Sequence, residues 1–317
     1  MLNIYDQQRH NKRATWLIVF LFIIFFGIIG LGFDLFFTGA PPVGTTIAVV
    51  IAAISVLATY YNGDKIVLAS TGARPVNHAI LKEHQFYNIV EEVKIASGLP
   101  MPKVYIIPDP DPNAFATGRN PERASIAITE GLLNKLNRDE LQGVVAHEMS
   151  HIRNFDIRLM MLIAALVGAI VLLSDWSARS MRSMGRSRDS RKGGGGAVFF
   201  FIIWLLLIIL APIIAQIMAM AISRRREYLA DASGAELIRN PLALANALEK
   251  IENAALPTRS IKQGTAHLCI ADPLGRSFTS REGFFANLMA THPPMPKRIQ
   301  ALKEMGYLYQ SKESKES

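Results

Sequence analysis

The clearest chemical signal in the sequence is the pentad His147-Glu-Met-Ser-His151. On an α-helix the two histidines are one turn apart on one face, so both imidazoles can bind a single Zn²⁺ ion. Glu148 lies about 100° around the helix from His147. It can therefore act as a general base on water at an open coordination position without being a ligand. The alternative is two ordinary surface histidines. The pentad predicts a hydrolytic site with one zinc ion per chain.

A catalytic zinc site needs a third protein ligand, and the stretch Glu227-Tyr-Leu-Ala-Asp231 offers one. Its two acidic residues are also one turn apart on a helix. Glu227 is the expected ligand. Asp231 is expected to accept a hydrogen bond from a ligand imidazole and fix its tautomer. Taken alone, the pair is more typical of a solvated acidic pair that offsets the charge of Arg224–Arg226.

Four apolar runs decide where this site lies, and they cover residues 16–33, 43–61, 159–174 and 197–223. A spanning helix needs about 20 apolar residues, within a range of about 17–25. The first, second and fourth runs are long enough, and the third is marginal. Half of the chain is apolar and only 19% is charged, below the roughly 25% of a soluble domain. We therefore expect four transmembrane or membrane-associated helices.

The distribution of Lys and Arg around these runs predicts the orientation in the membrane. Residues 1–15 carry three of these residues and the 39–42 turn carries none, which places the N-terminus in the cytoplasm. The basic, Gly-rich loop 175–196 opposes this orientation, so the second hairpin either spans against its charge or is re-entrant. In both cases the chain returns to the side it left, which brings Glu227 to the same membrane face as His151.

Between and after the hairpins the sequence has the pattern of a soluble α+β domain. Asn137 followed by Glu140 is an N-cap signal, and it predicts a helix that continues through the pentad. Other helices are expected over 78–97, 224–239, 241–253 and 296–305, and short strands over 104–107, 114–116 and 125–129.

The expected fold class is mostly α with a small β-sheet. In order, the expected parts are a cytoplasmic segment 1–15, a hairpin 16–61, a catalytic part 62–158, a second hairpin 159–223, a second catalytic part 224–309 and a flexible polar tail 310–317.

The formal charge of +8 lies largely in short basic clusters beside the apolar runs, where anionic lipid headgroups are expected. No motif that combines basic and aromatic residues for nucleic-acid binding is visible. The expected partners are therefore the membrane and protein substrates, with no nucleic acid. The single cysteine, Cys269, excludes an intramolecular disulfide and a zinc finger built on cysteines.

These motifs, in this order, resemble the HtpX family of membrane zinc metalloproteases, which are relatives of the CAAX prenyl endopeptidases. The resemblance rests on two flanking hairpins and on four ordered segments: Asn113–Gly118, His147–His151 with Asp156, Arg226–Asp231, and Thr291–Pro294 with Arg298. It implies a zincin-like catalytic domain of the gluzincin type. It also implies that His147, His151 and Glu227 are the zinc ligands and that Glu148 is the general base.

The resemblance also assigns roles that spacing alone does not. Asn113, Ala114, Phe115 and Ala116 match an edge strand that binds the substrate backbone by β-augmentation, and the alternative for this stretch is a hairpin turn. His292 and Arg298 match a histidine and an arginine near the scissile bond. A histidine there can help to stabilise the oxyanion, and an arginine can orient a carboxylate or the substrate carbonyl. Their alternatives are a loop histidine and an exposed residue in the first turn of a helix. Asp156 either orients a ligand or is a polar residue at the membrane surface.

Together these features predict a zinc-dependent endopeptidase anchored by its own helices. The resemblance implies a multi-pass protein of the bacterial inner membrane whose catalytic domain faces the cytoplasm. It further implies cleavage of misfolded or damaged membrane proteins during quality control and the stress response. The alternative is a membrane scaffold or transporter with a structural or vestigial metal. The candidate spans argue against it because they carry essentially no charge apart from Asp34.

Overall fold

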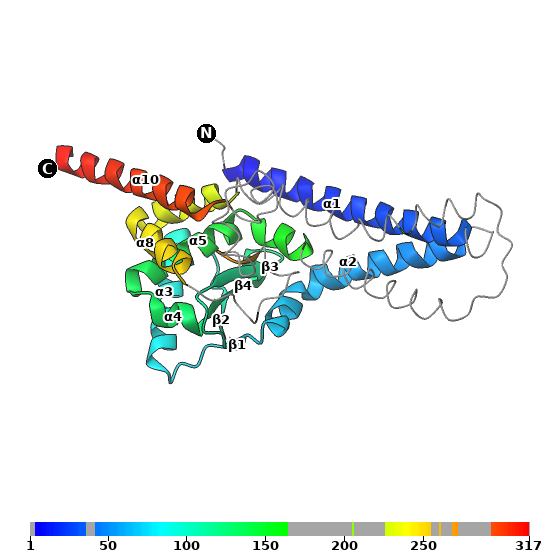
Figure 1. Ribbon diagram of the computed structural model, residues 1–317, viewed down its shortest axis with the longest axis horizontal. Helices are drawn as coiled ribbons and strands as arrows, with labels where there is room; N and C mark the ends of the chain where they lie inside the picture. Colours follow the sequence, from blue (N-terminus) through cyan, green and yellow to red (C-terminus); the bar gives the residue numbers. More distant parts are fainter. Residues whose placement is uncertain are drawn as a thin grey trace.

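The computed structural model describes residues 4–35, 42–163, 205, 226–254, 260, 268–271 and 293–316. It begins with α1 (Ile4–Phe33) and α2 (Val43–Ser70), which pack side by side in a long hairpin projecting from the rest of the molecule (Figure 1). The stretches Asn11–Phe33 and Val43–Ser70 are long and apolar enough to cross a membrane.

The first two apolar runs thus lie within longer helices, whose outward faces expose large apolar side chains such as Trp16, Phe20 and Ile54. Most of the expected second hairpin, 159–223, lies outside the described residues.

At the far end of the α1–α2 hairpin, a buried carboxylate caps the start of α2. One oxygen of Asp34 accepts a hydrogen bond from the backbone N–H of Gly44 (2.6 Å). The other accepts from the N–H (2.8 Å) and the hydroxyl (2.8 Å) of Thr45. The first N–H groups of a helix have no partner within the helix and carry partial positive charge. The one acidic residue of the first apolar segment is therefore accounted for by helix capping.

A four-stranded sheet forms the centre of the other part, in the order β1-β2-β4-β3. The strands are β1 (Arg74–Pro75), β2 (Lys103–Ile107), β3 (Ala114–Gly118) and β4 (Ala124–Thr129). β2 and β4 are parallel, whereas β1 pairs antiparallel with β2 and β3 pairs antiparallel with β4. The three expected strands are confirmed, and the two-residue β1 is additional. β3 lies at one edge of the sheet.

Helices cover the sheet, and α5 (Arg138–Arg153) is the one that positions the candidate site. It begins with the expected capping box: the Asn137 side chain accepts from the Glu140 N–H, and the Glu140 carboxylate accepts from the Asn137 N–H (2.9 Å each). This reciprocal pair fixes the first turn. One face of α5 packs on β3 and β4, and α3 (Leu81–Ser97) and α8 (Pro241–Glu252) pack alongside it.

Shorter helical segments and the last helix also belong to the described fold, among them residues 156–163, which follow α5 after a two-residue turn. A one-turn helix, α4 (Glu130–Lys135), precedes α5, and residues 226–238 are helical. α10 (Met295–Glu316) packs on α8 and ends at the C-terminus (Figure 1). It is longer than the helix expected over 296–305, because residues 306–316 continue it, including most of the tail expected over 310–317.

Candidate metal centre

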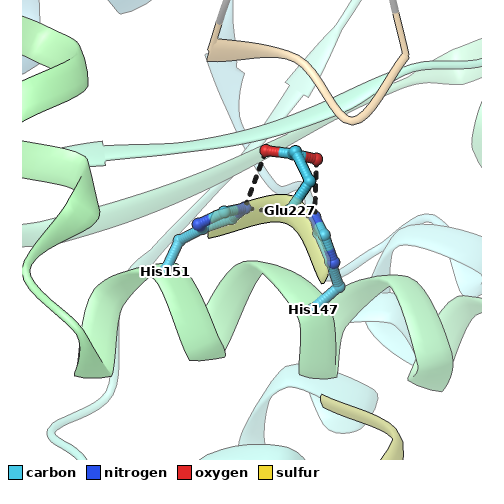
Figure 2. A group of neighbouring side chains, drawn as sticks. All are labelled: His147, His151 and Glu227. Atoms are coloured by element: carbon cyan, nitrogen blue, oxygen red, sulfur yellow. Dashed lines mark hydrogen bonds and ion pairs between the residues drawn. The ribbon is translucent and has the colours of Figure 1, made fainter. Parts of the chain in front are cut away.

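Three buried side chains from two helices converge at the centre of the molecule. His147 and His151 extend from one face of α5, and Glu227 faces them from the helical segment 226–238 (Figure 2). The Nε2 atoms of the two imidazoles are 3.1 Å apart. The Glu227 carboxylate lies 3.7 Å from His147 Nε2 through Oε2 and 3.6 Å from His151 Nε2 through Oε1. The structure thus brings together the three residues expected as ligands.

This arrangement fits a zinc ion. Two atoms that each lie about 2.0–2.1 Å from one ion at a tetrahedral angle are about 3.3 Å apart. The three separations of 3.1, 3.6 and 3.7 Å lie on either side of that value. Two imidazole nitrogens and one carboxylate are a donor set of catalytic zinc sites, which keep a fourth position open. Among the described residues, these three form the one group of His, Cys, Asp and Glu able to hold a metal.

A glycine allows the two helices to approach this closely. A Cβ atom at Gly234 would lie 2.8 Å from the backbone nitrogen of His147 and 3.0 Å from its Cα. Both are backbone atoms of α5 and cannot rotate away. Only a residue without a side chain therefore lets the 226–238 segment pack on α5 at the level of His147, one turn of α5 before His151.

Glu148 is buried on α5 next to the candidate ligands, with an exposed fraction of 1%. Burial and the negative charge of Glu227 raise the pKa of Glu148 to about 7, although His151 and a hydrogen bond from the backbone of Ala116 act in the opposite direction. Its Oε2 atom has no hydrogen-bond partner among the described residues. A buried carboxyl group with a pKa near neutrality and a free acceptor atom has the properties required of a general base.

An ionised carboxylate faces the outer nitrogen of His147. Asp231 Oδ1 lies 3.0 Å from His147 Nδ1. Arg298 donates to both oxygens of the same carboxylate, from Nε to Oδ2 (2.8 Å) and from Nη2 to Oδ1 (2.7 Å). Burial alone would raise the pKa of Asp231, but the charge and hydrogen bonds of Arg298 outweigh it and lower the pKa. An ionised carboxylate 3.0 Å from Nδ1 favours the His147 tautomer that carries its proton on Nδ1, which leaves the Nε2 lone pair for a metal.

Arg298 does not occupy the exposed position that was the alternative expectation for it. It lies in the first turn of α10 but is fully buried, so its interpretation as an exposed residue is wrong. Its guanidinium also lies 3.2 Å from Glu227 Oε2 and donates from Nη1 to the backbone carbonyl of Ile270 (2.9 Å). The arginine therefore bridges the ligand carboxylate and Asp231. Its expected contact with substrate stays a prediction.

The outer nitrogen of His151 faces a second buried carboxylate. Asp156 Oδ2 lies 3.0 Å from His151 Nδ1, and Asp156 has no exposed surface. Burial lowers the pKa of His151, but the hydrogen bond with Asp156 and the charge of Glu227 outweigh it and raise the pKa to about 9. The structure thus places Asp156 against the expected ligand His151, and its role in orienting that ligand stays a prediction.

Two further residues contact Asp156, and the sequence alone assigns neither of them a part in the site. Arg226 is buried, with Nε 3.6 Å from Asp156 Oδ1, whereas its sequence context predicts a basic cluster at the membrane surface. Asn11 of α1 donates from Nδ2 to the same oxygen of Asp156 (2.6 Å). No local pattern marks either residue, because the partner of each lies far away in the sequence.

Ala114, Phe115 and Ala116 belong to the edge strand β3 and Asn113 directly precedes it, so the interpretation of this stretch as a hairpin turn is wrong. The outer edge of β3 is contacted by another part of the same chain. Phe115 and Cys269 form an antiparallel bridge, and the Ile270 N–H donates to the carbonyl of Ala114 (2.9 Å). Asn113 Nδ2 donates to the carbonyl of Ala271 (3.2 Å). Residues 268–271 therefore lie where an added strand would pair. His292 lies outside the described residues.

Comparisons with known proteins agree with this site. Residues 81–306 match the model of peptidase family M48. The chain is 46% identical over 306 residues to a protein named protease HtpX homolog from Thermoanaerobacter pseudethanolicus, covering 95% of this chain and 98% of the relative. It is 40% identical over 306 residues to a protease HtpX homolog from Streptococcus pneumoniae, covering 95% of this chain and 100% of the relative.

Among solved structures, the crystal structure of S. mikatae Ste24p matches 95% of this chain and 66% of its own, with a TM-score of 0.48 and 18% identity. The chain thus spans slightly less than two thirds of that protein. The family assignment rests on the sequence matches, which cover most of the chain at up to 46% identity. The chain belongs to peptidase family M48 and, within that family of metalloproteases, to the HtpX proteases.

Proposed function

We propose that this membrane metalloprotease is a zinc-dependent endopeptidase in which Glu148 is the general base. The observation that carries the proposal is the convergence of His147, His151 and Glu227 in a buried site, with the Glu148 carboxyl group beside them. When bound there, zinc supplies a Lewis acid that polarises the scissile carbonyl and increases the acidity of water.

The side chains around the ligands have distinct parts in this mechanism. Glu148 accepts a proton from the attacking water and delivers it to the leaving amine. Asp231 and Asp156 hold the two ligand imidazoles through their Nδ1 atoms, which lie 3.0 Å away in each case. His292 is assigned to oxyanion stabilisation because of its match to the family motif.

The proposed substrates are unfolded or damaged membrane proteins at the cytoplasmic face of the bacterial inner membrane. The family relationship supports this, and so does the position of the site. The helix 156–163 follows α5 closely and packs on the membrane hairpin, where a Cβ atom at Gly63 of α2 would lie 2.6 Å from Met161 Sδ. Pairing with the backbone along β3 would accept many sequences, which suits quality control.

The test is a comparison of full-length wild type with Glu148→Gln in detergent, with zinc content and cleavage of an unfolded casein measured on the same samples. We expect about one zinc per chain in both proteins, and cleavage slower by about 10²–10⁴-fold in Glu148→Gln. Glu140→Gln is the matched control. It makes the same change on the same helix, and Gln retains the capping box. Glu227→Ala should lose zinc.

Two results would overturn the proposal. Cleavage by zinc-loaded Glu148→Gln at the wild-type rate would exclude Glu148 as the base. Absence of zinc from wild type purified without chelators would exclude the metal site.

A further inference from the structure

The N-terminal part of membrane helix α1 contacts the turn that follows the metal-binding helix α5. Gln8 Nε2 donates to the carbonyl of Arg153 (2.8 Å). One turn further along α1, Asn11 Nδ2 donates to the carbonyl of Asn154 (2.9 Å) and to Asp156 Oδ1 (2.6 Å). Asn11 is 1% exposed, so the contact is shielded from solvent. The first membrane helix thus reaches the carboxylate that faces a zinc ligand.

Both amide hydrogens of Asn11 are engaged by acceptors. A carbonyl and a carboxylate oxygen can only accept, so the nitrogen of the amide must face both, and the opposite amide orientation is excluded. Both oxygens of the Asp156 carboxylate therefore have partners. Oδ1 accepts the hydrogen bond from Asn11 and lies 3.6 Å from Arg226 Nε. Oδ2 lies beside His151 Nδ1. The amide is neutral and orients the carboxylate without neutralising it.

We propose that Asn11 is a positioning residue for the zinc ligand His151 and acts through Asp156. The inference rests on the proposed zinc site. Groups that orient a ligand imidazole typically change metal affinity by about 10–100-fold when removed. Asn11 is one contact further from the metal, so we expect its loss to weaken zinc binding by about tenfold, at the lower end of that range. The membrane anchor then contributes a side chain to the architecture of the metal site.

The experiment measures the zinc dissociation constant of full-length protein in detergent by competition with a chromogenic chelator, a readout independent of proteolysis. Asn11→Leu removes both donors at similar size. Gln8→Leu is the matched control, because it removes a hydrogen bond from the same helix to the same turn without touching Asp156. We expect the dissociation constant to rise about tenfold in Asn11→Leu and to stay at the wild-type value in Gln8→Leu. Asn11→Ala replaces Asn11→Leu if the latter does not fold.

A double-mutant cycle separates positioning from general stabilisation. If Asn11 acts through Asp156, Asn11→Leu has no further effect on zinc affinity in an Asp156→Ala background. Equal zinc affinities of Asn11→Leu and Gln8→Leu, or fully additive effects with Asp156→Ala, would overturn the inference. Failure of the proposed metal site is a different result, since wild type would then bind no zinc, and failure of Glu148 as the base would leave the zinc affinities unchanged.

Discussion

Replacing Arg298 by Met should destabilise the fold far more than removing an ordinary arginine. The guanidinium is fully buried and donates two hydrogen bonds of 2.7 and 2.8 Å to Asp231, and it also lies 3.2 Å from Glu227. Met fills much of the same volume but leaves two buried carboxylates without their cation. The cost arises mainly from the uncompensated charges, because the lost contacts themselves are partly offset by the desolvation of the arginine.

The expected magnitude follows from this burial. Removal of one partner of a buried ion pair costs about 3–5 kcal/mol. For a domain of about 150–250 residues, 1 kcal/mol corresponds to about 2–4 °C in Tm. The expected fall in Tm is therefore about 6–20 °C. Arg138→Met is the matched control. Arg138 pairs with Glu92 on the surface, with side chains 59% and 42% exposed, and such a pair contributes about 0–1 kcal/mol.

The assay is thermal unfolding of both variants and wild type in detergent. The metal-free forms are compared, because bound zinc would add a contribution to stability that depends on its affinity. A Tm of Arg298→Met no lower than that of Arg138→Met would refute the reasoning. It would mean that the carboxylates of Asp231 and Glu227 are already neutral or solvated without the arginine.

Gly234→Ala should displace the helix that carries Glu227, since the added Cβ would lie 2.8 Å from the backbone nitrogen of His147. We therefore expect weaker zinc binding in chelator competition. The control is Gly27→Ala, whose Cβ would lie 3.5 Å from its nearest neighbour and which should bind zinc like wild type. Equal affinities would contradict the packing argument. Hydrogen bonds from Arg74 lower the pKa of Glu83 from its ordinary 4.5, so the pair stabilises the fold above that pH and loses its effect as pH falls through the lowered pKa. Thermal unfolding should show Glu83→Gln less stable than wild type at pH 7 and the difference shrinking below pH 4.5, and a pH-independent difference would refute it.

The parts of the site that lie within one helix could be predicted from the sequence. The capping signal at Asn137 and Glu140 gives the start of α5, and the helical period then fixes which side chains share a face. The spacing of Glu227 and Asp231 works in the same way. These predictions succeed because the interacting groups are one turn apart, so no tertiary information is required.

The rest of the site depends on contacts between distant segments. Arg298 meets Asp231 across 67 residues, and Asn11 meets Asp156 across 145. Charged residues are mostly exposed in proteins, so a lone arginine in the first turn of a helix is typical of the surface. Only the fold shows that Arg298 lies next to two buried carboxylates, those of Asp231 and Glu227. β1 was missed for another reason: two residues, one of them a proline, carry no alternation of polar and apolar side chains.

The pairing of residues 268–271 along β3 sets a competition for any peptide that binds there. The Ala114 carbonyl already accepts a hydrogen bond from the Ile270 N–H, and the Ile270 carbonyl accepts one from Arg298 Nη1. A tethered segment competes at an effective concentration of the order of mM. A short free peptide at micromolar concentration is therefore at a disadvantage, whereas a long unfolded chain that offers many registers, or one confined to the same membrane, competes better. If substrates pair along β3 as proposed, selectivity for unfolded chains would arise from the segment 268–271 that they must displace, without recognition of any particular sequence.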